Sequence, residues 1–68
     1  MKEYSRSDLE SHIENWIIGR NAERNRRILK RRLLDGITYD CLAEEFDLSV
    51  RQIKNIVYSC EDRLYRHI

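Results

Sequence analysis

Six polar side chains lie close together after Asp47, and their types suit hydrogen bonding to a nucleic acid. Arginine can donate two parallel hydrogen bonds to O6 and N7 of guanine, and glutamine or asparagine can pair in the same way with adenine. Lysine and tyrosine are suited to holding phosphate groups. The alternative is an ordinary solvated helix face, so the meaning of these residues depends on the elements that carry them. They are Ser49, Arg51, Gln52, Lys54, Asn55 and Tyr58.

Apolar residues recur at helical spacing through the same segment. The pattern predicts a helix that begins after Ser49, with the Ser49 hydroxyl as its N-cap. Its inward positions leave the polar side chains named above on the outward face, where the N-terminal residues of a recognition helix contact bases. The inward residues are Val50, Ile53, Ile56, Val57, Cys60 and Leu64.

A short helix over Tyr39–Phe46, capped by Thr38, precedes this one. Asp47 tolerates a left-handed backbone, which a tight turn between two helices requires. Two helices around a small shared core, joined by such a turn, are typical of a helix-turn-helix motif, here with its core at residues 38–59. In that arrangement the Thr38 hydroxyl and neighbouring amides are expected to hold a phosphate. The apolar and small positions that the motif needs are Leu42, Ala43, Phe46 and Leu48.

The N-terminal half predicts two more helices. Ser7 and Glu10 have the spacing of a capping box, and Gly19 suits the left-handed residue that ends the helix which follows. Asn21 is the predicted N-cap of a helix over 22–35, and Gly36 ends it. The apolar stripe of the first helix is Leu9, Ile13, Trp16 and Ile17, so we expect Trp16 in the core. The chain of 68 residues is therefore predicted to form one all-α domain (1–68) of four helices.

The charges are divided between segments. The formal net charge is only +1, but residues 20–32 hold seven basic side chains and one acid, whereas residues 40–47 hold four acids and no base. One surface can therefore meet phosphates while another repels them. Within the basic segment, Arg27 and Arg31 are the candidates for contacts to a DNA backbone, and a solvated face is the alternative.

The sequence gives little support for a metal site, for catalysis or for a membrane location. Cys41 and Cys60 are expected to be reduced thiols in the core or at its boundary, and with His12 and His67 they show no zinc-site spacing. Glu44 and Glu45 point about 100° apart on a helix, which does not suit a shared acid–base site. We therefore expect neither an enzyme nor a cofactor. The sequence has no span long enough to cross a membrane and no signal-peptide core, so a cytoplasmic location is expected.

The stretch from Ile28 to Leu64 resembles region 4 of bacterial sigma factors and the related LuxR-type domains. It has an arginine-rich helix, Gly36, the helix start Thr38-Tyr39, the sequence Leu42-Ala43-Glu44, and Leu48-Ser49 followed by a basic helix. It is also similar to small helix-turn-helix proteins of phages and mobile elements. The resemblance covers residues 20–66 and implies a DNA-reading module, without the sigma region that melts promoters.

Two hypotheses for the function follow. The first is a small transcriptional regulator that binds double-stranded DNA in a sequence-specific way. The second is a protein-interaction module that binds RNA polymerase or another regulator, which the near-zero net charge and the acidic segment 40–47 favour. Monomer and homodimer both stay open, because a dimer suits palindromic sites while the sequence fixes no interface.

Overall fold

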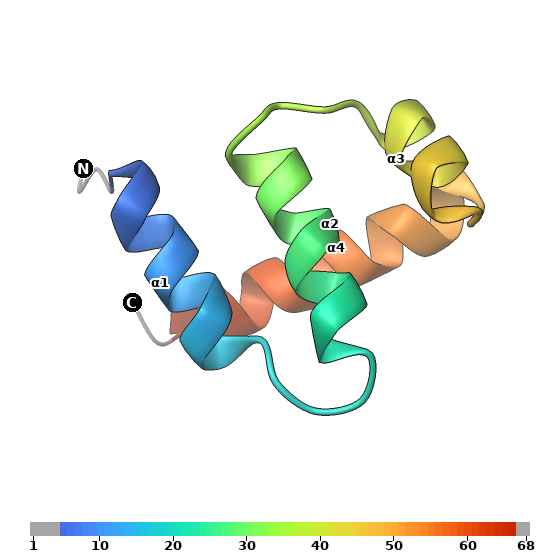
Figure 1. The fold of residues 1–68 in the computed structure, drawn as a ribbon. Coiled ribbons are helices and arrows are strands. Elements are labelled where there is room, and N and C mark those ends of the chain that lie inside the picture. The colour runs from blue at the N-terminus through green and yellow to red at the C-terminus, as the bar shows by residue number, and fades with distance from the viewer. Residues whose placement is uncertain (1–4, 67–68) are drawn as a thin grey trace.

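The computed structural model describes residues 5–66, which form four helices and no strand. The helices are α1 (Arg6–Trp16), α2 (Ala22–Leu33), α3 (Tyr39–Phe46) and α4 (Val50–Arg66). The longest, α4, passes behind α2, while α1 and α3 lie near its opposite ends (Figure 1). The prediction of a small all-α domain of four helices is confirmed.

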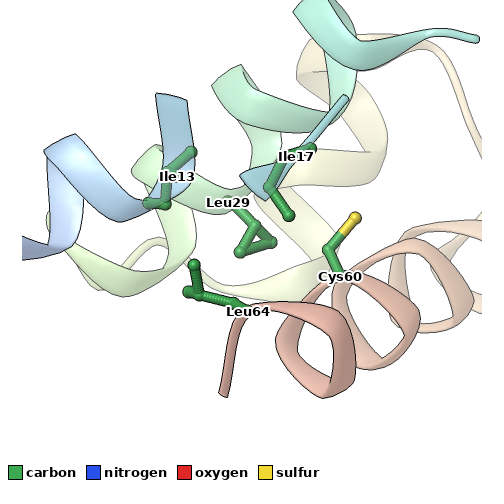
Figure 2. Close-up of a cluster of buried hydrophobic side chains, with 5 residues drawn as sticks. All are labelled: Ile13, Ile17, Leu29, Cys60 and Leu64. Carbon is green, nitrogen blue, oxygen red and sulfur yellow. The ribbon is translucent and has the colours of Figure 1, made fainter. Parts of the chain in front are cut away.

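Two clusters of buried side chains hold the helices together. One joins α1, α2 and the C-terminal half of α4 through Ile13, Ile17, Leu29, Cys60 and Leu64 (Figure 2). The other joins α2, α3 and the N-terminal half of α4 through Ile28, Leu42, Ala43, Ile53 and Val57. The partly buried Ile56 packs against both clusters. The exposed face of α4 is therefore fixed by packing along the whole helix.

The first helix begins earlier than the sequence pattern predicts. Its capping box is made by Ser5 and Asp8, and the prediction of Ser7 and Glu10 is wrong. The Asp8 amide donates to Ser5 Oγ over 3.1 Å, and the Ser5 amide donates to the Asp8 carboxylate over 3.4 Å. The earlier start places Arg6 in the first turn, where it reaches the Leu34 carbonyl and the Asp35 carboxylate.

The end of α1 also differs from the prediction. The helix stops at Trp16, and Ile17 is buried through an extended backbone with φ −94° and ψ 93°. Gly19 has the expected positive φ of 98°, but it lies in the turn after the helix and does not cap it. Trp16 remains 36% exposed, so its predicted place in the core is wrong. Because the chain leaves the helix here, Ile17 takes the buried position beside Ile13.

The predicted start of α2 is right in position but not in mechanism. Asn21 precedes the helix in a left-handed conformation (φ 62°), and its side chain makes no capping hydrogen bond. The helix ends at Leu33, two residues before the predicted Asp35. Asp35 lies outside the helix and binds both Arg6 (2.9 Å) and Arg31 (3.4 Å).

The segment from Thr38 to Ser49 agrees with the sequence prediction. Thr38 caps α3 by accepting a hydrogen bond from the Cys41 amide over 3.2 Å. Asp47 is left-handed (φ 56°), and the Leu48 amide donates to the Ala43 carbonyl over 2.9 Å, which closes the helix end. Three residues thus connect α3 to α4.

The two cysteines have different environments. Cys60 is buried, as expected, and burial raises the pKa of its thiol against the opposing effect of Arg63 and Arg24. Cys41 is exposed on α3, so its predicted core or boundary place is wrong. The inward side of this short helix is already filled by Leu42 and Ala43. Among residues 5–66, no helix has the length and apolar character needed to cross a bilayer.

The contact of α3 with α4 predicts a strict limit on side-chain size at Ala43. Ala43 is 9% exposed and belongs to the cluster with Ile53 and Val57. We expect Ala43→Leu to lower the free energy of unfolding by about 1–3 kcal/mol through overpacking. Urea denaturation measures this effect. Glu44→Leu adds the same side chain at the exposed neighbouring position, and an equal loss in both variants would contradict the prediction.

The ion pairs of Asp35 predict a pH-dependent contribution to stability. The hydrogen bond from Arg6 is the largest cause that lowers the pKa of Asp35. A carboxylate with a lowered folded-state pKa stabilises the fold above its unfolded-state pKa, and this stabilisation is lost as the pH falls. We therefore expect Asp35→Asn to be less stable than the parent protein at pH 7, with the difference shrinking below about pH 4. Thermal unfolding across this range measures it, with Glu44→Gln as the control; a difference independent of pH would contradict the assignment.

Candidate nucleic-acid interface

The outward face of the first eleven residues of α4, 50–60, carries donor side chains and no acid. Arg51, Asn55 and Tyr58 are exposed, and residues 50–60 include no aspartate or glutamate. Arg51 and Asn55 are four residues apart, so they lie one above the other on the same face of the helix. Two groups able to read base edges therefore share one exposed surface.

The first turn of α4 is fixed by a reciprocal capping box. The Gln52 amide donates to Ser49 Oγ over 3.1 Å, and the Ser49 amide donates to Gln52 Oε1 over 2.9 Å. This satisfies two amides that a helix start otherwise leaves unpaired. Because the acceptor oxygen of Gln52 is used here, Asn55 is better placed than Gln52 to pair with adenine, which requires both a donor and an acceptor. The sequence pattern placed Gln52 on the recognition face but did not reveal this second role.

An aromatic pair with two cations lies beside this face. The rings of Tyr39 and Tyr58 meet edge to face, with centroids 6.3 Å apart. Arg32 lies 4.3 Å and Lys54 lies 5.7 Å from the Tyr39 ring centroid. A hydrogen bond with Tyr39 is the largest cause that raises the pKa of Tyr58. This contact fixes the position of Tyr58 on α4.

A hollow of about 320 Å³ opens at the N-terminal end of α3. It is lined by Thr38 and Tyr39 of the helix start, by Arg32 of α2, and by Lys54 of α4. The two cations and the positive end of the helix favour an anion, while the carboxylate of Asp40 in the same lining opposes one. The predicted candidates Thr38 and Lys54 therefore meet here, and Arg32 joins them.

The two arginines predicted to contact phosphates lie elsewhere. Arg31 donates to Glu45 (2.8 Å) and Asp35 (3.4 Å), and its hydrogen bond with Glu45 is the largest cause that raises its pKa. The Arg27 guanidinium lies 5.6 Å from the Phe46 ring centroid. Both arginines thus contact the second half of α3, and a phosphate at Arg31 has to compete with two carboxylates.

Arg32 is the residue that sequence reasoning missed. It lies four positions after Ile28, whose side chain is buried against α4, so helical spacing turns Arg32 toward α3 and α4. Its guanidinium also donates to the Ile37 carbonyl over 3.0 Å, which fixes it beside the start of α3. The sequence could have identified Arg32 by its position one helical turn after Ile28, on the side of α2 that faces α3 and α4.

Comparisons of the chain with protein-family models, with curated proteins and with solved structures gave no match. The resemblance to sigma region 4 therefore stays an expectation from the sequence motifs. Among residues 5–66 no three side chains of the metal-binding types gather in one place, and His67 lies outside the described residues.

The capping box predicts a measurable role for Ser49 in stability. We expect Ser49→Ala to lower the free energy of unfolding by about 1 kcal/mol, since an N-cap hydroxyl is lost. Ser59→Ala is the matched control, because Ser59 lies in the interior of the same helix, where alanine is preferred. Chemical denaturation of both variants checks this, and equal stability of the two would rule out the capping role.

Proposed function

We propose that α3 and α4 act as a helix-turn-helix motif and that α4 enters the major groove of double-stranded DNA. The observation that carries the proposal is the exposed face of residues 50–60 of α4, which holds no acid and on which Arg51 and Asn55 are one helical turn apart. Arg51 would pair with guanine and Asn55 with adenine. Four residues of helix rise about 6 Å, so the two bases would lie within about two base-pair steps of each other.

The surroundings of this face support the same docking. The hollow at the start of α3 offers Arg32, Lys54 and the Thr38 hydroxyl to one DNA strand beside the groove. Such contacts position a protein on the duplex without reading its sequence. Asp47 and the capping box of Ser49 and Gln52 hold the beginning of α4 rigidly, so the reading side chains keep a fixed register.

The charge distribution is compatible with this orientation. Three of the acids on α3 and its end, Glu44, Glu45 and Asp47, are absent from the lining of the hollow. Glu45 is occupied by Arg31, which removes part of its repulsion toward a phosphate. Asp40 is the one acid among the residues that line the hollow, and we expect it to weaken contact with the DNA backbone there. A small transcriptional regulator is the role that we infer for such a module.

Binding to random duplexes, followed by selection of preferred sequences, tests the proposal. We expect binding at 50 mM salt that weakens steeply as salt is added, because counterions are released from the phosphates. Arg51→Ala should remove the preference at one base pair, a loss of about 1–3 kcal/mol in discrimination, with little change in folding. Arg66→Ala is the matched control on the far end of the same helix.

Lys54→Gln tests the backbone contact separately. We expect it to weaken binding to all sequences alike and to reduce the slope of log K against log salt by about 1. No binding at 50 mM salt would refute the proposed function as a whole. If Arg51→Ala selected the same DNA sequences as the parent protein, Arg51 would not contact a base. The orientation proposed for α4 in the major groove would then be wrong.

A further inference from the structure

A second hollow of about 510 Å³ lies between the α1–α2 turn and the middle of α4. Three apolar side chains line it: Ile18 from the turn, and Ile56 and Cys60 from α4. Ile18 is 58% exposed, although Ile17 before it is buried. We call this hollow the turn groove. Its apolar lining suits an apolar side chain of a ligand.

The exposure of Ile18 is built into the fold. The Arg26 guanidinium donates to the Ile17 carbonyl over 2.7 Å, and the Arg63 guanidinium donates to the Ile18 carbonyl over 3.1 Å. These bonds come from α2 and α4 and hold the turn from both sides. The backbone is therefore fixed so that Ile17 enters the core while Ile18 stays at the surface. Because the turn is already ordered before binding, a partner that contacts Ile18 does not lose the entropy of ordering this segment.

The rim of the turn groove supplies cations and hydrogen-bond donors. Arg20 and Arg63 line it, and none of the lining residues is acidic. Asn25 also lines it, and the Asn25 Oδ1 atom accepts from Arg24 at 3.3 Å, so its amide nitrogen is left to donate. The turn groove therefore has a positive rim around an apolar floor.

We propose that the turn groove binds an acidic amphipathic segment of a partner protein. One large apolar side chain of the segment would contact Ile18 and Ile56, while its carboxylates pair with Arg20 and Arg63. A bare phosphate backbone fits less well, because it would cover exposed isoleucine without burying apolar surface of its own. An amphipathic helix laid into a groove is a common form of such recognition.

This inference does not rest on the proposed DNA binding. Asn55 borders both the turn groove and the recognition face, so the variants below leave Asn55 unchanged. Loss of peptide binding and loss of DNA binding can then be told apart. The groove is small beside a standard protein interface, and we expect a weak complex with a dissociation constant on the order of 100 μM.

Titration of the isotope-labelled protein, followed by amide NMR, tests the proposal. The probe is a synthetic 15-residue helical peptide with leucines on one face and glutamates on the others. We expect the largest shifts at Ile18, Ser59 and Arg63. Ile18→Ser and Arg20→Glu should each weaken binding at least fivefold, measured at low salt. The matched controls are Tyr58→Ser, which removes a side chain of α4 that is about as exposed (56%) as Ile18 (58%), and Arg51→Glu; both should bind the peptide as the parent does.

Two control ligands complete the test. A peptide with lysine in place of every glutamate, and one with serine in place of every leucine, should both fail to shift the groove. Binding of the acidic peptide that is unchanged in Ile18→Ser would overturn the proposal, as would the absence of shifts at the groove. A strand of twelve thymidylates that shifts the same amides, and depends equally on Ile18, would identify a nucleic-acid surface instead.

Discussion

The packing of α2 across α4 is the constraint on which the rest of the molecule depends. Ile28 and Leu29 are adjacent in α2, yet each belongs to a different buried cluster. Ile28 reaches Ile53 and Val57 together with α3, and Leu29 reaches Cys60 and Leu64 together with α1. Ile56 lies between the clusters and contacts both. With one side of α4 buried over its length in this way, its opposite side has a fixed orientation.

The two surfaces beside α4 follow from the same packing. On one side, α3 brings its helix start and Tyr39 toward Lys54 and Tyr58, which forms a cationic hollow. On the other side, the α1–α2 turn brings Ile18 and Arg20 toward Ile56 and Arg63, which forms the turn groove. The first is polar and suits a phosphate, and the second has an apolar floor. Two ligands of different chemistry are therefore proposed for the two sides of one helix.

The sequence predicts most of the fold because local signals and apolar spacing agree from Thr38 to Leu64. The cap at Thr38, the left-handed Asp47 and the inward residues Ile53 and Val57 all have the predicted roles. Agreement fails near α1, where Ser5 and Ser7 both have a suitable acid three residues later. Tertiary contacts of Arg6 with Leu34 and Asp35 accompany the earlier start, and no local pattern contains them.

The candidate site is harder to predict than the fold, because the partners of long side chains lie on other helices and depend on how those helices pack. Arg31 and Arg32 are neighbours with the same propensity, but Arg31 binds Glu45 and Arg32 lies on Tyr39. The partners lie on α3, so only the packing of α2 against α3 separates the two arginines. The same holds for Ile17 and Ile18, of which one is buried and the other exposed because the turn is held by Arg26 and Arg63.

We propose that the exposed N-terminal half of α4 is the surface that meets DNA. Amide NMR shifts of the labelled protein, measured during titration with a short duplex at 50 mM salt, test it most directly. We expect the largest shifts at residues 49–59 and around Thr38, with the C-terminal turn of α4 and the outer side of α1 unaffected. Shifts confined to the Arg27 and Arg31 side of α2, or no shifts at any residue, would contradict it.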